Sequence, residues 1–424
     1  MHSPEEKQPQ AVEEFDVVVV GGGSAGVAAA AGAARTGCRT RLIEKYAFLG
    51  GAATASSVSI YCGFFDQSRR RVVDGVGGRV LRRLHQRGVY QEGSFSWSGN
   101  HFVLLDVETT KAVLDEETAA AGVDVRLHST LVGARQEDGR LREIEIAGPG
   151  GRHRVRARAF VDASGDGALC ALSGAGVRIA PLADRQTSTL VSRYGGVAPD
   201  ADLSREGVRA AVTAHNRRSS RPLPREQGVL ARLPVTGEII ALLADEHADT
   251  LDAAALTAAE INARRQARDY LDAFRAHLPG WEGAYLLATG PQLGIRESRR
   301  LRAREEVRGS DVLAARKRPG ESIARCGWPV EDHAGPGVTR YVPIEGKGWY
   351  DIPYGAICSA DLDNLWAAGR LTGSDDDAFA SLRVMGTAFA TGHAAGVAAA
   401  LYARGTEHVV PAIRTELLRQ GAFV

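Results

Sequence analysis

The segment from residue 15 to residue 44 constrains the fold more than any other part of this 424-residue chain. Four consecutive valines at 17–20 form a short β-branched apolar run, which is typical of a strand buried on both faces. A Gly-x-Gly-x-x-Gly motif follows at once, and an alanine-rich stretch with helical character continues to about Thr36. A second short apolar strand then ends on Glu44. This order predicts a strand–helix–strand unit of a parallel sheet.

Each part of this unit suits the binding of a dinucleotide. Gly21 permits a tight turn, Gly23 lets the backbone approach a pyrophosphate, and Gly26 lets the helix pack closely on the strand. The helix N-terminus offers unpaired N–H groups and a positive dipole end to the phosphates. Glu44, 18 residues after Gly26, can accept hydrogen bonds from ribose hydroxyls. The glycine motif is weak evidence alone, but the agreement of all five parts predicts a Rossmann-like domain.

Two further glycine-rich turns point to a flavin dinucleotide. Gly50 and Gly51 directly follow the second strand, where a flavoprotein chain must pass close to the pyrophosphate and ribityl chain. A simple strand-to-helix loop is the alternative interpretation. Residues 54–65 are then expected to run toward the isoalloxazine. The sequence VDASGDG at 161–167 is a second glycine–acid turn after a strand, and α/β sheets bind ligands outside the carboxyl ends of their strands.

Composition excludes several other classes of protein. The net charge is +1, with 52 basic against 51 acidic residues, so no nucleic-acid or membrane partner is expected. The five cysteines are scattered without metal-ligand spacing, which predicts no metal site and a reduced, cytoplasmic location. Residues 1–12 read as a flexible N-terminus rather than a signal peptide, and the apolar segment 388–402 is shorter than the roughly 20 residues that span a bilayer. High alanine, arginine and glycine content indicates a GC-rich bacterial genome.

The chain is expected to fold as an α/β protein with an inserted domain. Residues 13–170 form the first part of the FAD-binding domain and include a three-stranded β-meander, whose turns are Asp138-Gly139 and 149–151. Residues 171–357 form an α+β substrate domain, and residues 358–405 return to the FAD-binding domain.

Two features of the inserted domain are predicted in detail. Thr257 and Glu260 match a capping box at the start of a long helix. Residues 217–225, with two prolines, match an exposed and mobile loop.

The returning segment predicts a second helix N-terminus near the cofactor. A short strand ends on Gly369, and a helix over 383–404 follows. Its small residues Ala388, Gly392 and Gly396 are spaced four apart, which allows close backbone packing. A glycine-ended strand followed by such a helix favours phosphate or flavin binding.

Five segments spread over residues 15–401 resemble the bacterial FAD-dependent oxidoreductase family within the glutathione-reductase-type flavoproteins. They are GGGSAG, LIEK with LGG, VDASGDG, GIRESRR, and WAAGRLTG with SLRVMGTAFATGHAAGVAAAL. The resemblance implies a non-covalently bound FAD, with the turn after Gly369 along the ribityl chain and residues 384–387 at the flavin N1/O2 edge. The acids at 374–377 depart from the family pattern.

The motifs and the resemblance together give a set of predicted FAD contacts. These are Gly21, Gly23, Ser24, Ala25, Gly26, Glu44, Lys45, Gly50, Gly51, Ala52, Thr54, Leu131, Val132, Ala163, Ser164, Gly165, Gly369, Arg370, Met385, Gly386 and Thr387.

The predicted activity is hydride transfer between flavin N5 and a small organic metabolite. The chain lacks a second Gly-x-Gly-x-x-Gly and a C-x4-C pair, which argues against the pyridine nucleotide-disulfide reductases. A flavin monooxygenase is the first alternative, and a redox-neutral isomerase or cyclase is the second. Free NAD(P)H or O2 is the expected redox partner, and the sequence does not indicate an oligomeric state.

Four residues are predicted to contact the substrate: Arg296, His333, Tyr354 and Arg383, with Arg299 behind them. Arg296 lies in GIRESRR, His333 in a presumed loop WPVEDH, and Tyr354 in a β segment. An arginine can hold a carboxylate through two hydrogen bonds, and a histidine or tyrosine can exchange the proton that accompanies hydride transfer.

Overall fold

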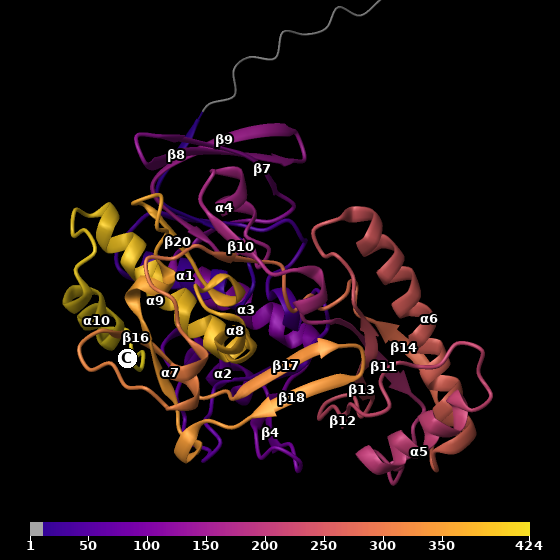
Figure 1. Cartoon of the computed structure of the whole chain (residues 1–424). Coiled ribbons are helices and arrows are strands. Elements are labelled where there is room, and N and C mark those ends of the chain that lie inside the picture. The colour runs from indigo at the N-terminus through magenta and orange to yellow at the C-terminus, as the bar shows by residue number, and fades with distance from the viewer. Residues whose placement is uncertain (1–11) are drawn as a thin grey trace, which may run out of the picture.

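The computed structural model describes residues 12–424. The expected flexible N-terminus, residues 1–12, therefore lies outside the described residues except for Val12. Figure 1 shows three parts of the molecule: a central α/β region, a β-ribbon at one end, and an inserted sheet with two helices at the side.

The main sheet has the strand order β6-β2-β1-β9-β8-β7, and β20 pairs with β9. The strands β6, β2, β1, β9 and β20 are parallel to their neighbours, whereas β7, β8 and β9 form the antiparallel meander. Their bounds are β1 Glu13–Val20, β2 Thr40–Ile43, β6 Asp124–Arg126, β7 Thr130–Glu137, β8 Arg140–Gly148, β9 Gly151–Asp162 and β20 Leu365–Ala367. The predicted α/β class with a Rossmann-like domain and a three-stranded meander is confirmed.

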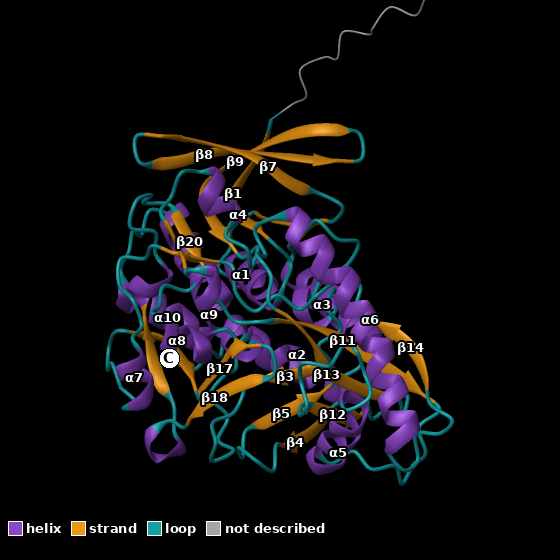
Figure 2. Ribbon diagram, turned by 45° about the vertical axis from the view of Figure 1, so that its right-hand side comes forward, coloured by secondary structure: helices purple, strands orange, loops and turns teal. Residues whose placement is uncertain are grey.

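The strand β9 is long enough to belong to both the parallel sheet and the antiparallel meander. Its first half pairs with β8 in the meander and its last residues pair with β20, and both neighbours lie along the same edge of β9. Along its other edge it runs parallel to β1. The meander consequently projects from the end of the sheet as a twisted ribbon (Figure 2).

Helices α1 (Ser24–Arg35) and α9 (Met385–Ala403) pack against each other through small residues. A Cβ atom added to Gly392 would lie 2.1 Å from the Ala25 carbonyl oxygen, and one added to Gly396 would lie 1.9 Å from that of Ala29. The predicted close backbone packing of this helix is thus confirmed. The helices α2 (Val76–Gln86), α3 (Val107–Ala121) and α10 (Val410–Arg419) pack around this pair.

The predicted helix over 383–404 corresponds to α9 to within two residues at each end, but a separate helix just before it, α8, was not anticipated. α8 spans Asp376–Leu382, α9 begins at Met385, and the two meet at 96°. Val384 between them is extended (φ −73°, ψ 152°), which ends one helix and starts the next. The final helix α10 was not anticipated. Among residues 12–424, no single helix is long and apolar enough to cross a membrane, and only this bent pair reaches that length and composition together.

The inserted region has its own four-stranded sheet, in the order β12-β13-β11-β14, covered by helices α5 and α6. Buried Tyr194, Phe274 and Trp281 lie in its core. The bounds are β11 Ser188–Gly195, α5 Arg205–Asn216, β12 Val229–Arg232, β13 Ile239–Glu246, α6 Ala253–His277 and β14 Tyr285–Thr289.

The capping-box prediction for this region is wrong, and the predicted exposed loop is exposed over most of 217–222 but not at its end. α6 begins before Thr257, and the Asp252 side chain caps it by accepting a hydrogen bond from the Ala255 N–H group. The end of the presumed exposed loop is also buried, because Arg225 is drawn into an ion pair with Asp245.

Two antiparallel strand pairs follow the inserted sheet: a hairpin, and an outer pair whose strands flank that hairpin in the sequence. β17 (Val330–Gly335) pairs with β18 (Val338–Val342), and β16 (Ser322–Cys326) pairs with β19 (Tyr350–Pro353). WPVEDH therefore enters a strand instead of a loop. The hairpin β17–β18 reaches the inserted region, where the Thr187 N–H group donates to the His333 carbonyl oxygen at 2.9 Å.

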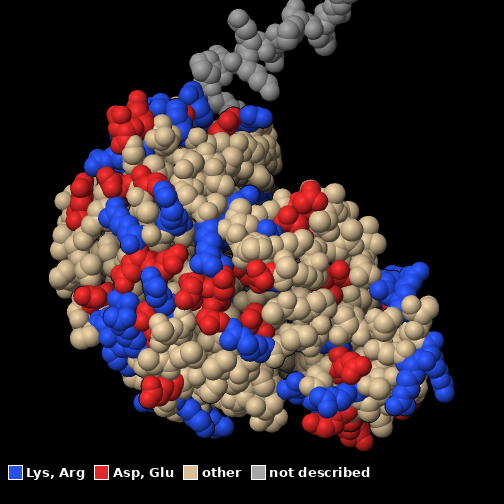
Figure 3. Space-filling model, in the orientation of Figure 1, with Lys and Arg blue, Asp and Glu red and all other residues tan. Residues whose placement is uncertain are grey.

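The remaining elements are short. They are β3 Ile60–Cys62, β4 Gln91–Ser94, β5 His101–Leu104, α4 Ala168–Leu172, β10 Val177–Ile179, β15 Arg299–Leu301 and α7 Gly309–Leu313. The face of the molecule in Figure 3 carries basic and acidic side chains intermixed, as the net charge of +1 requires.

The contact between α1 and α9 gives a stability prediction. An alanine normally stabilises a helix by about 0.5–1 kcal/mol relative to glycine. We expect Gly396→Ala to lower the free energy of unfolding by about 1–3 kcal/mol instead, because its Cβ cannot fit beside Ala29. Urea unfolding followed by circular dichroism measures this. Ala390→Ser, on a partly exposed position of the same helix, is the control and should cost at most about 0.7 kcal/mol.

Candidate functional site

The N-terminus of α1 carries polar groups that the protein leaves unpaired. Gly23 is the N-cap residue, and no side chain caps the helix. The Ser24 hydroxyl is buried and has no hydrogen-bond partner among the described residues. A buried orphan hydroxyl beside free N–H groups costs free energy unless a ligand binds there. The site therefore fits the diphosphate of a dinucleotide.

The three glycines of the motif differ in why the fold needs them. Gly21 has φ +98°, and a Cβ on Gly26 would lie 1.6 Å from the Gly21 carbonyl oxygen. Gly23 has an ordinary φ of −71°, and a Cβ there would meet nothing closer than the Gly51 Cα at 3.7 Å. The protein itself leaves room for a side chain at Gly23, so a bound ligand is the reason that the position stays bare.

Glu44 is buried next to the motif at the end of β2. One of its carboxylate oxygens accepts from the Gly22 N–H group at 2.5 Å, and the other accepts from the Tyr46 N–H group at 2.9 Å. Each oxygen retains acceptor capacity for a ribose hydroxyl. Glu44 thus also holds the glycine turn in place, a structural role that the sequence did not reveal.

The glycine pair after β2 lies beside the motif. Gly50 and Gly51 have φ of +118° and +56°, and the Gly50 N–H group donates to the Gly22 carbonyl oxygen at 2.8 Å. The Thr54 hydroxyl donates to the Leu49 carbonyl oxygen at 2.7 Å, so it supports this loop instead of facing a ligand.

The turn after β9 also reaches this place. Its Asp162 carboxylate is fully buried and accepts from the Ser164 N–H group and hydroxyl, which commits Ser164 to the turn. Gly165 (φ +76°) lies against the guanidinium of Arg370, which pairs with Asp166 at 3.3 Å.

The other predicted FAD contacts differ in how exposed they are and in how close they lie to the glycine motif. Lys45 is half-exposed, with Nζ 3.8 Å from an Asp166 carboxylate oxygen. On β7, Leu131 packs against the core and Val132 is exposed, but the segment just before them is tied to Glu44, whose carbonyl oxygen accepts from the Ser129 N–H group. Ala25 and Ala163 are buried at the motif, and Gly369 is enclosed between α1 and α9.

The N-terminus of α9 lies at the other end of the predicted FAD site. Val384 is its N-cap, without a side-chain cap, and the Val384 and Met385 side chains line a cavity. Gly386 is packed on the backbone of Gly63, and the Thr387 hydroxyl donates to the Cys326 sulfur at 3.2 Å. At these two predicted contacts, only backbone atoms can face a cofactor.

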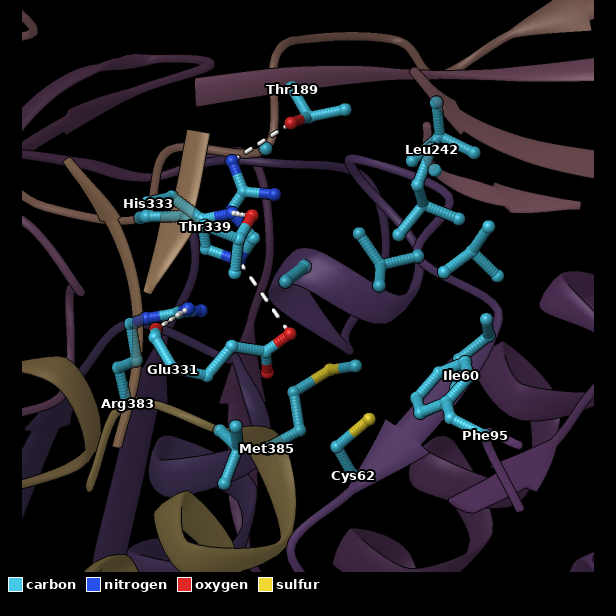
Figure 4. A pocket seen from close by; sticks show the side chains of 18 of the residues that line it. Ile60, Cys62, Phe95, Thr189, Leu242, Glu331, His333, Thr339, Arg383 and Met385 are labelled. Carbon is cyan, nitrogen blue, oxygen red and sulfur yellow. Dashed lines mark hydrogen bonds and ion pairs between the residues drawn. The ribbon is translucent and has the colours of Figure 1, made fainter. Parts of the chain in front are cut away.

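A cavity of about 350 Å³ extends from the N-terminus of α9 to the inserted sheet. Ala52, Arg370 and Met385 line its cofactor side. Figure 4 shows that the rest divides into an apolar side and a polar side. The labelled apolar residues are Ile60, Phe95 and Leu242, and the labelled polar residues are Thr189, Glu331, His333, Thr339 and Arg383.

The polar side brings together three of the four predicted substrate residues: Arg296, His333 and Arg383. Arg296 donates to the Thr187 carbonyl oxygen at 2.7 Å and to the Thr189 hydroxyl at 2.8 Å. Arg383 donates to the Glu331 carbonyl oxygen at 2.8 Å. Burial lowers the pKa of Arg383, although nearby acids such as Glu331 oppose this. Burial also lowers the pKa of Arg296, where Asp245 opposes the shift and the guanidinium groups of Arg383 and Arg225 add to it.

His333 is neutral and its tautomer is fixed. Its Nδ1 atom lies 3.1 Å from the Thr339 hydroxyl and 3.5 Å from the Arg225 guanidinium. A guanidinium can only donate, so Nδ1 accepts and Nε2 carries the hydrogen. Nε2 lies 3.8 Å from the Glu331 carboxylate. Burial and the surrounding arginines Arg296, Arg383 and Arg225 hold the pKa of His333 well below its usual range.

The structure does not bring Tyr354 to the cavity, which corrects that prediction. Its hydroxyl lies 2.8 Å from Nδ1 of His408 and accepts from the Trp366 indole at 3.0 Å, in a buried aromatic cluster. Arg299 likewise turns away and donates to the Asp166 carbonyl oxygen. Tyr354 begins a short 3₁₀ helix over Tyr354–Ile357 instead of lying in the expected β segment, which turns its side chain away from the cavity.

The unexpected acids at 374–377 are structural. Asp375 caps α8, Asp376 pairs with Arg300 and Arg178, and Asp377 pairs with Arg340. They therefore do not set the charge of the cavity.

Sequence reasoning missed several residues of the site. Glu331 lines the cavity, and its carboxylate accepts from the Trp328 indole at 2.9 Å. Asp245 is fully buried and binds Arg225, Thr187 and Thr189. An acid at the end of the apolar strand 239–244 was a signal for Asp245, whereas nothing in the sequence singled out Arg225.

Comparison with known proteins identifies the family. The model of the family described as FAD dependent oxidoreductase matches residues 16–420. A search of curated proteins found no significant match.

Among the described residues, no group of three or more His, Cys, Asp or Glu is arranged to hold a metal ion.

Solved structures show the same fold at low sequence identity. A geranylgeranyl bacteriochlorophyll reductase-like protein from Thermoplasma acidophilum matches with a TM-score of 0.51 and 16% identity, over 97% of this chain and 85% of that one. BexE, studied for oxidation during BE-7585A biosynthesis, matches with 0.50 and 14%, over 96% and 66%. A triple mutant of the flavin-dependent brominase Bmp2 matches with 0.50 and 13%, over 96% and 84%.

The spare room at Gly23 gives a prediction about cofactor binding. We expect Gly23→Ala to fold with nearly unchanged stability but to bind FAD at least about tenfold more weakly, or about 1.4 kcal/mol, because the methyl group occupies the phosphate position. Gly26→Ala should instead lose stability, since its Cβ overlaps Gly21. Flavin fluorescence titration of the apoprotein and thermal unfolding measure both. Full FAD affinity in Gly23→Ala would contradict the assignment.

Proposed function

The chain belongs to the FAD dependent oxidoreductase family, and from that premise we propose that this enzyme transfers a hydride between its FAD and a small organic metabolite. The observation that carries the proposal is the single cavity shared by the two sides. Ala52, Arg370 and Met385 on the cofactor side and His333 and Arg383 on the polar side line the same space. A substrate in this cavity contacts both the cofactor and groups that can orient it.

The residues present fit FAD at both ends of the predicted cofactor site. The uncapped N-terminus of α1 would hold the diphosphate, and Glu44 would accept from the ribose hydroxyls. The uncapped N-terminus of α9 would supply N–H groups and a positive dipole end to the isoalloxazine. Bound FAD supplies the two-electron chemistry at its N5 atom, while the protein orients the substrate.

The proton that accompanies hydride transfer needs a carrier on the polar side. The Glu331 carboxylate and the Nε2–H group of His333 lie 3.8 Å apart, and both line the cavity. Because His333 is held neutral, it can donate a hydrogen bond to a substrate oxygen but does not act as a cation. Glu331 is then the proton acceptor, and the indole of Trp328 fixes its position.

The finer classification follows the same reasoning. We place the enzyme among the glutathione-reductase-type flavoproteins of a bacterium, because of its two glycine-rich turns and returning helix. The cysteines at 38, 62, 170, 326 and 358 are all free thiols, which supports a cytoplasmic location. Free NAD(P)H or O2 is the proposed redox partner, because the chain has one dinucleotide motif.

The reaction type can be tested on the holoenzyme with a metabolite panel. A hydride-transferring dehydrogenase should lose its flavin absorbance when mixed with its substrate anaerobically, without NAD(P)H. A monooxygenase requires NAD(P)H and O2 before the substrate is consumed, and a redox-neutral isomerase converts substrate with no net change in flavin absorbance. Either of these results would replace the proposed reaction.

The role of Glu331 gives a prediction for a variant. We expect Glu331→Gln to slow substrate-driven flavin reduction by about 10²–10⁴-fold, because the amide cannot accept the proton. The FAD content should be unchanged, since Glu331 is not on the cofactor side. Stopped-flow absorbance measures the rate, and Arg268→Gln, on the exposed face of α6, is the control. A rate within about threefold of the parent enzyme would assign the proton to another group.

A further inference from the structure

Buried arginines in this protein normally have a carboxylate of their own. Arg41, Arg185 and Arg225 are each buried, and each has a carboxylate oxygen within 2.8 Å. A guanidinium taken out of water is stabilised by such a partner, and without one it costs free energy. This pattern sets a standard for the arginines of the cavity.

The half-buried Arg296 and Arg383 have no carboxylate this close. The nearest carboxylate to Arg296 is Asp245 at 3.8 Å, which already binds Arg225, Thr187 and Thr189. Arg383 donates only to a main-chain carbonyl oxygen, and its Nε atom is buried without a partner among the described residues. In the part of the chain that the structure describes, no carboxylate lies within ion-pair distance of Arg383. Arg383 therefore lacks a counter-ion, and Arg296 has only a longer contact with an acid that other groups already bind.

The charges around these two arginines leave room for one anion. Arg225, Arg296 and Arg383 face Asp245 and Glu331, while His333 stays neutral. The Glu331 carboxylate accepts from the Trp328 indole and points to His333, so it does not bind either free guanidinium directly. Five arginines line the cavity against one carboxylate, that of Glu331, so an anionic ligand is favoured there.

The opposite side of the cavity defines the rest of the ligand. Ile60, Phe95 and Leu242 form an apolar wall, with Met385 between this wall and the polar side (Figure 4). Further along, Trp97 stacks edge-on with Tyr341 and also lines the cavity. An apolar or aromatic body fits this wall, whereas a sugar or a dianion does not.

We propose that the substrate is an apolar carboxylic acid, whose carboxylate binds between Arg296 and Arg383 and whose body lies against Ile60, Phe95 and Leu242. A carboxylate is favoured over other anions because the planar guanidinium fork matches its two oxygens. This inference rests on the proposed function, since it takes the cavity to be the substrate site. It goes further by naming the group that the enzyme recognises.

The test uses the oxidised holoenzyme and needs no turnover. Benzoate and its neutral isostere benzamide are titrated while the visible absorption of the bound FAD is followed. We expect benzoate to bind at least about tenfold more tightly than benzamide, because only benzoate carries the charge that the guanidinium groups recognise. Equal affinity of the two probes, or no binding of benzoate, would overturn the proposal without any variant.

Variants then locate the anion. Arg296→Gln and Arg383→Gln should each weaken benzoate binding at least about tenfold and leave benzamide binding unchanged, whereas Arg268→Gln should behave as the parent enzyme. If both variants bind benzoate normally, the arginines serve some other anion, such as the reduced cofactor, and the proposal fails. Carboxylate binding without anaerobic substrate-driven reduction would reject the hydride-transfer function but keep the anion site, so the two failures are distinguishable.

Discussion

The contact between α1 and α9 is the interaction on which the site depends. Gly392 and Gly396 bring the α9 backbone against the carbonyl groups of Ala25 and Ala29, so the two helices lie closer than side chains normally allow. Both helices begin at the same edge of the sheet, and neither has a side-chain cap. Because Gly392 in α9 lies against Ala25 at the start of α1, α9 begins nearly two turns ahead of α1, and one elongated anionic cofactor can use both positive helix ends.

The inserted sheet helps to form the cavity through the charge and hydrogen bonds of Asp245 as well as through its shape. Asp245 at the end of β13 is fully buried and gathers Arg225, Thr187 and Thr189, and it also accepts from the Gly337 N–H group of the β17–β18 hairpin. One carboxylate thus ties the hairpin that carries Glu331 and His333 to the sheet that carries Thr189. Removing such an acid would leave buried cations unpaired, at a cost of several kcal/mol. The geometry of the polar side depends on it.

Much of the cofactor half could be predicted from the sequence, because its requirements are local. A tight turn, an extended apolar run and a close helix contact each demand particular residues at fixed spacing, as Gly21, Gly26 and Gly396 show. The substrate half could not be predicted in this way. Arg225 appeared to lie in an exposed loop, Tyr354 appeared to face the substrate, and helix α8 was not anticipated. For the two side chains the outcome depends on partners 20 or more residues away in the sequence, namely Asp245 and His408.

The sequence by itself determined the fold class, the dinucleotide-binding turn and the family, because these rest on backbone geometry that few residues permit. Only the tertiary structure decided which charged residues share a cavity and which of them have partners. GIRESRR contributes Arg296 to the cavity but directs Arg299 to a carbonyl oxygen and Arg300 to acids on α8. The same side chain can be a counter-ion or a binding group. What separates the two is whether folding brings a carboxylate within hydrogen-bond distance, which no local pattern encodes.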